Sequence, residues 1–173
     1  MADALDPDAL GLRHEWCAYA HVALHTNEEY ARSLVELGRC ATVGAFWRLQ
    51  RHTPAVGRVF DDVHAAVVRG RRVEGYSLFR ASSRPEWEHA SQRGGFVLHA
   101  RQNVSAELAE RAWLDLRLAA ICGDGFGELV NGVRLVSKPG TRGLRRCFKF
   151  EVWCPLSSAR ADAPAYVCDC IAV

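Results

Sequence analysis

The sequence lacks the segments that would place the chain in a membrane or direct it out of the cell. No stretch reaches the roughly 18 consecutive apolar residues of a membrane span. Residues 1–12 carry three aspartates instead of the basic and then apolar pattern of a signal peptide. We therefore expect a cytoplasmic or nuclear protein without a membrane partner, and we expect residues 1–12 to form a flexible N-terminal arm.

Cysteine and histidine patterns typical of a metal site or a disulfide framework are also absent. The seven cysteines form an odd set without any C-x-x-C pair, and the seven histidines show no H-E-x-x-H spacing. Cys168 and Cys170 would share one face of a strand, but two further ligands at a suitable spacing are missing. We expect reduced thiols, no bound metal and no cofactor.

Signatures of a catalytic nucleophile are missing as well. Neither a nucleophile elbow nor the residue order of a catalytic triad occurs, which disfavours a small hydrolase that uses a cysteine with a histidine. We expect a binding protein and not an enzyme. Of the 173 residues 49% are apolar and 24% are charged, a composition typical of one globular unit, so we expect a single, monomeric domain over residues 13–173.

The apolar pattern predicts an α+β fold. Runs rich in β-branched and aromatic residues predict strands at 15–24, 31–40, 76–80, 96–101, 129–138 and 147–153. Thr42 suits the N-cap of a short helix that ends near His52, and Ser105 suits that of a longer helix that ends near Cys122. An extra helical insertion is predicted at 57–70, where apolar residues recur at helical spacing: Val59, Phe60, Val63 and Val67.

The predicted helix at 105–122 has two apolar stripes, and one helix with two stripes needs two partners. The first stripe should face the sheet, whereas the second would stay uncovered unless another protein docks on it. The first consists of Ala109, Trp113, Leu116 and Ala120, and the second of Leu114, Leu118 and Ile121.

A net charge of +2 conceals a strongly basic segment, residues 129–150, with six basic residues and no acidic one. An anionic partner is therefore expected at this part of the surface. On the strand at 147–153, alternation places Lys149, Glu151 and Trp153 on one face, and a tryptophan that shares a face with a lysine is unusual for a core.

Six short motifs, in this order, resemble the eukaryotic translation initiation factor 4E family over residues 16–153. Their order is what makes the resemblance specific, because each motif alone is weak. They are F-W-R-L at 46–49, G-Y-S-L-F at 75–79, P-E-W-E at 85–88, R-G-G at 93–95, R-A-W-L at 111–114 and a strand that ends in Trp153. The resemblance implies a divergent paralogue with a curved antiparallel sheet, backed on its convex face by about three helices.

The resemblance also implies a site for the 7-methylguanosine cap of messenger RNA. Trp87 would stack on the methylated base, Glu88 would accept its two N–H donors, and Trp153 would lie near its methyl group. The second ring of the aromatic sandwich falls on Tyr30, seventeen residues before Trp47, where the family carries tryptophan. A cationic base attracts aromatic faces and a carboxylate edge, so these residue types suit the ligand.

The phosphates of the cap require cations. The family's arginine and lysine on the last two core strands align with Lys138 and Lys149. The loop between these strands is longer here, so three further arginines on it are candidates for the same role: Arg142, Arg145 and Arg146.

The second helical stripe corresponds to the family's docking surface for scaffold proteins of the initiation factor 4G type or for repressors, which carry a Y-x-x-x-x-L-Φ segment. The matching positions are Val43, Trp47, Leu114 and Leu118, with Asp115 at the acidic position beside them. The expected function is cap binding in translation initiation. Two alternatives stay open: a cap-binding translational repressor, and an adaptor with a weakened cap site.

Overall fold

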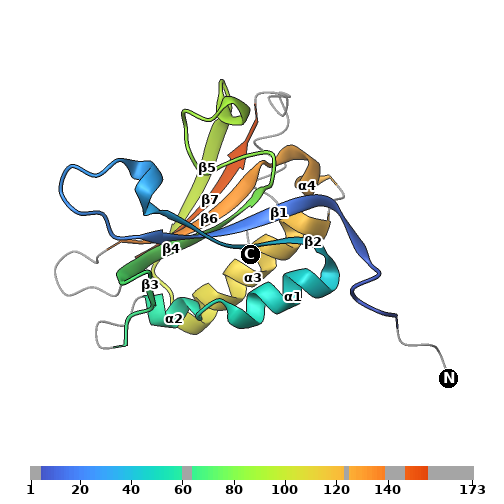
Figure 1. The fold of residues 1–173 in the computed structure, drawn as a ribbon, viewed down its shortest axis with the longest axis horizontal. Helices are drawn as coiled ribbons and strands as arrows, with labels where there is room; N and C mark the ends of the chain where they lie inside the picture. The colour runs from blue at the N-terminus through green and yellow to red at the C-terminus, as the bar shows by residue number, and fades with distance from the viewer. Residues whose placement is uncertain (1–4, 60–63, 123–124, 139–146, 156–173) are drawn as a thin grey trace.

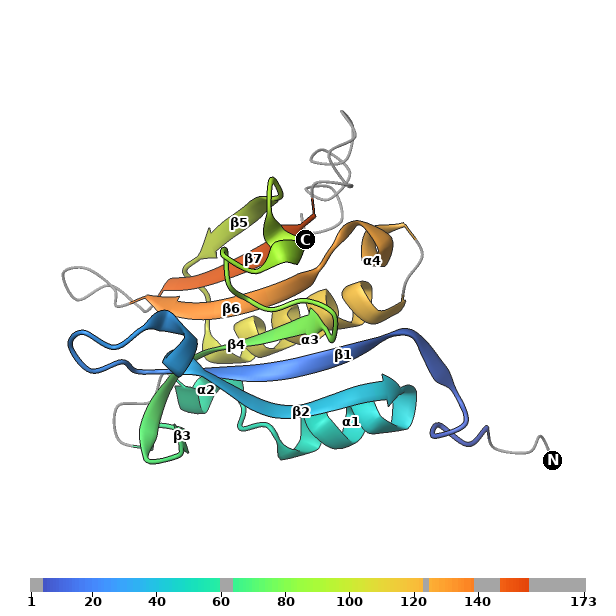
Figure 2. The ribbon, with the colours of Figure 1, turned by 45° about the horizontal axis from the view of Figure 1, so that its top comes forward.

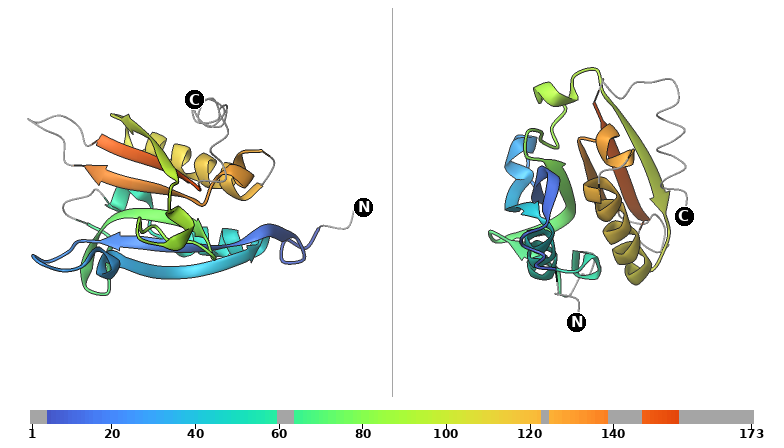
Figure 3. Two further views of the ribbon diagram at one scale, coloured as in Figure 1. Left: turned by 90° about the horizontal axis from the view of Figure 1, so that it is seen from above. Right: turned by 90° about the vertical axis from the view of Figure 1, so that its right-hand side faces the viewer.

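The computed structural model describes residues 5–59, 64–122, 125–138 and 147–155. Its main element is a seven-stranded antiparallel sheet in the order β2-β1-β4-β6-β7-β5, with the short β3 paired to β4 (Figure 1). The strands are β1 (Gly11–Val22), β2 (Leu34–Thr42), β3 (Val67–Val68), β4 (Arg71–Arg80), β5 (Phe96–Gln102), β6 (Gly132–Lys138) and β7 (Cys147–Cys154). Figure 3 shows the strong twist of the sheet, across which β4 and β6 remain paired.

The helices cover one face of this sheet. They are α1 (Val43–His52), α2 (Val56–Val59), α3 (Ala106–Cys122) and α4 (Phe126–Leu129). Both α1 and α3 lie behind the sheet in Figure 2, where α1 contacts β2 and α3 contacts β1 and β6. The expected class, an antiparallel sheet backed by helices, is confirmed. None of the helices in the described part of the chain is long and apolar enough to cross a membrane.

Alternation along the strands divides the sheet into a helix-covered face and an open face. Side chains such as Trp16, Leu78 and Val133 join the main core under the helices, where they are almost fully buried. The open face carries a smaller apolar cluster, formed by Cys17, Tyr19, Phe79 and Trp153. Polar residues that alternate with the main core are thus directed to the open face.

The two predicted helix starts are confirmed by their caps. The Thr42 hydroxyl accepts a hydrogen bond from the amide of Ala45 at 3.1 Å, and the Ser105 hydroxyl accepts one from the amide of Leu108 at 3.3 Å. In α3 the whole first stripe is buried, as expected. Leu114 and Leu118 of the second stripe are only half-buried, whereas Ile121 is buried in the main core.

The predicted helical insertion at 57–70 is wrong over most of its length. Helix α2 covers only Val56–Val59, and the segment ends in strand β3 and a hairpin to β4. Arg69 and Gly70, the two residues between these strands, both have positive φ, at 51° and 74°, as a two-residue hairpin turn requires. The turn and its cross-strand pairing override the helical spacing of the valines, and Val67 is left exposed. Residues 60–63 lie outside the described part.

Several boundaries differ from the expected ones. Strand β1 begins at Gly11, four residues earlier than expected, and a 3₁₀ turn at Tyr30–Ser33 precedes β2. Helix α4 was not expected. Ahead of β1, Asp8 accepts a hydrogen bond from Arg48 of α1 at 2.6 Å, and the amide of Gly44 donates to the carbonyl of Pro7 at 2.9 Å.

Candidate functional site

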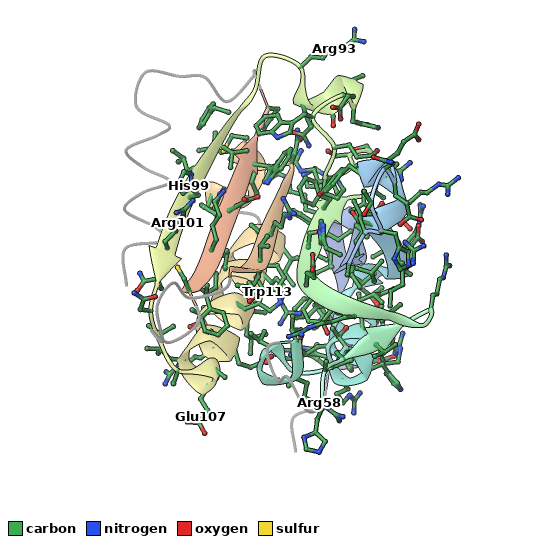
Figure 4. All side chains as sticks on the ribbon, turned by 90° about the vertical axis from the view of Figure 1, so that its left-hand side faces the viewer. Arg58, Arg93, His99, Arg101, Glu107 and Trp113 are labelled. Atoms are coloured by element: carbon green, nitrogen blue, oxygen red, sulfur yellow. The ribbon has the colours of Figure 1, made fainter. Side chains whose placement is uncertain are left out.

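A cleft of about 460 Å³ opens on the face of the sheet that the helices leave uncovered. It is lined by Trp87, Val97, His99, Arg134, Val136, Lys149, Glu151 and Trp153. Strand register explains this set, because His99, Glu151 and Arg134 lie opposite one another across β5, β7 and β6. Figure 4 shows His99 and Arg101 on β5, the edge strand of the cleft.

The buried carboxylate of Glu151 lines the cleft and has three hydrogen-bond donors around it. Glu151 is only 5% exposed. It accepts hydrogen bonds from Nε1 of Trp153 at 3.1 Å and from a guanidinium nitrogen of Arg134 at 3.4 Å. Its second oxygen lies 2.7 Å from Nζ of Lys149. Burial acts to raise the pKa of this carboxyl, but the hydrogen bond from Lys149 and the charge of Arg134 outweigh burial and lower it, so Glu151 is ionised at neutral pH.

Two tryptophans meet at one end of the cleft. The rings of Trp87 and Trp153 have centroids 4.3 Å apart and planes inclined by 34°. Trp153 is 2% exposed and packs edge-on against Phe79, with centroids 5.6 Å apart, whereas Trp87 is 53% exposed. Trp153 is therefore part of the rigid sheet, and Trp87 is a ring presented by a loop.

A buried polar network holds the loop that carries Trp87, residues 81–95. Asn131, just before β6, donates from its side-chain amide to the carbonyl of Ser91 at 2.8 Å and to Oε1 of Gln92 at 3.2 Å. Gln92 donates in turn to the hydroxyl of Ser83 at 2.8 Å. Asn131 also donates its backbone amide to the carbonyl of Trp153 at 2.7 Å. One residue thus ties the Trp87 loop to the strand of Trp153.

Tyr30 lies on the 3₁₀ turn before β2 and is held from two sides. Its hydroxyl is 3.3 Å from Nδ1 of the buried His21, whose Nε2 is 2.8 Å from the hydroxyl of Ser77. The guanidinium carbon of Arg134 lies over the Tyr30 ring, 5.8 Å from its centroid. Burial raises the pKa of Tyr30, so its hydroxyl is protonated. The ring is 38% exposed, which leaves part of it open to a ligand.

The remaining residues expected at the ligand site have different placements. Glu88 is exposed on the loop and does not line the cleft, so its contact with the base stays a prediction. Lys149 lines the cleft, and the side chain of Lys138, the last residue of β6, lies outside the described part of the structure. Arg142, Arg145 and Arg146 lie outside the described residues, as do Cys168 and Cys170.

Sequence reasoning did not single out four residues that the fold brings to the site: His21, His99, Arg134 and Glu151. A signal existed for Glu151, because alternation placed it on the face of Trp153 and Lys149. Arg134 was counted only as one charge of the basic segment. His21 lies on a strand distant in sequence from the rest, and its contact with Tyr30 depends on the tertiary fold.

The expected docking residues lie on α1 and α3, on the opposite face of the sheet from the cleft. Trp47 is 38% exposed and packs edge-on against the buried Phe46, with centroids 5.3 Å apart. Asp115 is exposed, and Val43, Leu114 and Leu118 are half-buried. The apolar side chains of this surface are thus supported by the core but not covered by the described part of the chain.

Within the described residues, no group of three or more histidine, cysteine, aspartate or glutamate side chains is placed to hold a metal ion. Five thiols are free there: Cys17, Cys40, Cys122, Cys147 and Cys154. Burial raises the pKa of Cys17 and of Cys40 to about 11, so both are unreactive neutral thiols of the core.

Solved structures with the same fold include proteins from Ascaris suum, C. elegans and a schistosome. The chain resembles Ascaris suum eIF4E-3 in complex with the m2,2,7G cap, with a TM-score of 0.72 and 20% identity over 94% of this chain and 82% of that one. It resembles C. elegans eIF4E-3 in complex with the 4E-binding protein Mextli, with a TM-score of 0.71 and 19% identity over 94% and 84%.

A third relative is schistosome eIF4E complexed with m7GpppG and 4E-BP, with a TM-score of 0.69 and 18% identity over 94% of this chain and 80% of that one. No curated protein matches the chain. The profile of the family described as eukaryotic initiation factor 4E, in contrast, matches residues 11–162, which span nearly the whole chain and both of the surfaces described above. The chain therefore belongs to the eukaryotic initiation factor 4E family.

Proposed function

We propose that this protein binds the 7-methylguanosine cap of messenger RNA in the cleft and carries a scaffold or repressor protein on α1 and α3. It acts in translation initiation as a binding protein and not as an enzyme. The observation that carries the proposal is the position of Trp87, an exposed ring above Trp153 at the end of a cleft that also contains Glu151 and Lys149.

The chemistry of the cleft matches that of the cap. Methylation at N7 gives guanine a delocalised positive charge, which aromatic faces attract by about 2 kcal/mol or more when the pair is desolvated. About half of the surface of Trp87 is already in solvent, so its open side is available to stack on the base. Glu88, one residue further along the loop, would then reach the N1–H and N2–H edge of the base.

Tyr30 would supply the second ring of an aromatic sandwich. Its ring already has the guanidinium of Arg134 over it, so the site attracts a planar cation. Tyrosine is a weaker π donor than tryptophan, which reduces the affinity by about 1 kcal/mol or less. The triphosphate would extend toward Lys149, a lining residue of the cleft, with Lys138 expected as its second cation.

The helical surface suits a partner segment that folds into an amphipathic helix. Trp47 of α1 and Leu114 and Leu118 of α3 offer an apolar platform, and Asp115 adds a negative charge beside it. The structural relatives from C. elegans and the schistosome are complexes with 4E-binding proteins, which supports a protein partner for this chain as well.

A second candidate function is an adaptor with a weakened cap site. It is favoured by the contacts that the two candidate stacking rings already make within the protein. Trp87 packs on Trp153, and the guanidinium of Arg134 lies over the ring of Tyr30. A ligand that stacks on the covered face of either ring must replace that contact, which lowers its net affinity. The same weakening is compatible with a repressor that holds caps without promoting initiation.

Retention on immobilised 7-methylguanosine triphosphate separates these functions. A cap-binding protein is retained and is eluted by free 7-methylguanosine triphosphate but not by GTP at the same concentration. The Trp87→Ala variant should flow through, and Trp47→Ala, which alters the opposite face, should be retained. Equal elution by both nucleotides would reject the cap-binding proposal. Failure of the wild-type protein to be retained, together with binding of a Y-x-x-x-x-L-Φ peptide, would establish the adaptor.

A further inference from the structure

We propose that Glu151 is a specificity-determining residue: its buried charge favours the cationic base and opposes the anionic phosphates, so that binding depends more on methylation and less on phosphate number. This inference rests on the proposed cap binding. The resemblance to the family assigns no role to this carboxylate, and none to its partner Arg134.

Glu151 is placed to act on both parts of the ligand. One oxygen lies 2.7 Å from Nζ of Lys149, the cation expected to meet a phosphate. The other accepts the hydrogen bond from the indole nitrogen of Trp153, the ring beneath Trp87. With 5% of its surface exposed, the carboxylate acts through a poorly screened environment.

Toward the base, Glu151 makes Trp153 a stronger π donor. An indole N–H that donates to an ionised carboxylate lies in a negative field, which polarises electron density into the ring and increases its attraction for a cation. The carboxylate itself adds direct attraction for the positive charge of the methylated base. An unmethylated guanine carries no such charge and gains from neither effect.

Toward the phosphates, Glu151 subtracts from the positive charge of the cleft. Arg134 and Lys149 alone would present two positive charges, and Glu151 reduces their sum to one. A phosphate that reaches Lys149 must share it with a carboxylate already in contact with the ammonium group. Repulsion between the two anions over a few ångströms offsets part of the attraction of the lysine.

Stability is a weak explanation for this ion group. Buried ion pairs cost desolvation free energy, and well-packed apolar residues in their place are often neutral or stabilising. The group also lies on the open face of the sheet, among the lining residues of the cleft, and not in the main core under the helices. A role in setting the potential of the cleft accounts for both facts.

The test compares Glu151→Gln with the wild-type protein by calorimetric titration of three nucleotides: 7-methylguanosine triphosphate, 7-methylguanosine monophosphate and GTP. In the variant, the preference for triphosphate over monophosphate should rise about three- to tenfold, because one nearby anion is gone. The preference for 7-methylguanosine triphosphate over GTP should fall by a similar factor. Glu151→Asp keeps the charge and should stay near the wild type in both ratios.

Two further variants make the outcome specific. Glu36→Gln also removes one negative charge, but from an exposed pair with Arg39 on β2, and should leave both ratios unchanged. Arg134→Gln removes a positive charge from the same ion group and should lower the preference for the triphosphate, the opposite direction to Glu151→Gln. This second variant tests the charge effect even if Glu151→Gln does not fold.

Unchanged ratios in folded Glu151→Gln would overturn the inference and leave cap binding intact. Equal shifts in Glu151→Gln and Glu36→Gln would overturn it as well, because net charge alone would then explain the effect. Failure of the wild-type protein to distinguish 7-methylguanosine triphosphate from GTP would instead reject the proposed function, and the inference with it. The wild-type titrations therefore tell the two failures apart.

Discussion

The ring of Trp87 lies against that of Trp153, with centroids 4.3 Å apart, although Trp87 is 53% exposed and Trp153 only 2%. Trp153 is fixed in the sheet by its contacts with Phe79 and Glu151, whereas Trp87 belongs to a loop. Trp153 therefore supports Trp87 from one side and leaves the exposed part of the Trp87 ring available for a planar base.

Trp87→Ala should weaken binding of 7-methylguanosine triphosphate about 10- to 30-fold, the contribution of one aromatic stacking partner. Its effect on the free energy of unfolding should stay within about 1 kcal/mol, since the ring is half exposed. Trp153→Ala should lower the free energy of unfolding by about 3–5 kcal/mol, because it removes a buried ring. Calorimetric titration and urea unfolding measure both quantities. Full affinity in Trp87→Ala would contradict the stacking role.

Glu88→Ala should weaken 7-methylguanosine triphosphate binding more than Lys149→Ala does. The carboxylate would make the desolvated, charge-assisted contact with the base edge, whereas Lys149 already shares its charge with Glu151. Titration of both variants with the same nucleotide gives the order directly. The reverse order would mean that the phosphates dominate the affinity.

Asn131→Ala should weaken cap binding about three- to tenfold without removing any group that touches the ligand. The substitution removes the donor that ties Ser91 and Gln92 to β6, and leaves buried acceptors unsatisfied at about 1–3 kcal/mol. Faster amide hydrogen exchange in residues 81–95 should accompany the loss. Asn103→Ala, at an exposed position just after β5, is the matched control. Unchanged exchange in the loop would show that Asn131 does not position it.

Stability should fall as the pH drops from about 6.5 toward 5, the range in which unfolded histidine gains a proton. Burial, together with the charge of Arg134, holds the pKa of His21 well below its usual value, so the folded state stays neutral while the unfolded state becomes charged. This contribution is complete above the unfolded pKa and is lost below it, by up to about 1.4 kcal/mol per pH unit. Urea unfolding at several pH values measures the slope.

His21→Gln should flatten this pH dependence, and it provides the control for the assignment. The pKa of His14 is also lowered, chiefly by burial, so His14→Gln should remove only a smaller share of the slope. Carboxyl groups such as Glu28, whose pKa Arg71 lowers to about 2, affect stability only at more acidic pH. An unchanged slope in His21→Gln would contradict a neutral His21 in the fold.

Trp47→Ala should abolish binding of a Y-x-x-x-x-L-Φ peptide and change cap affinity by no more than a few-fold. Trp47 lies on α1, with the sheet between it and the cleft, so the two surfaces are expected to act independently. Fluorescence anisotropy of a labelled peptide and titration with the cap nucleotide measure the two effects. A large loss of cap binding in this variant would contradict the proposed separation of the surfaces.

Local features with local causes could be predicted from the amino-acid sequence alone. Thr42 and Ser105 cap their helices as expected, because a hydroxyl at that position satisfies a free amide whatever the rest of the fold does. The period-two pattern placed Lys149, Glu151 and Trp153 on one face of β7, and all three line the cleft. The order of six motifs was sufficient to identify the family, which the match over residues 11–162 confirms.

Which of these groups contact one another depends on the three-dimensional fold. Contacts of His21 with Tyr30, of Arg134 with Glu151 and of Asn131 with the Trp87 loop join strands and loops that no local pattern connects. At 57–70 the valines recur at helical spacing, yet the segment ends in a hairpin with its turn at Arg69–Gly70. Pairing with β4 stabilises the hairpin, whereas a short helix is only marginally stable by itself. Long-range pairing sets the cleft's geometry and charge, and a single sequence carries no direct record of it.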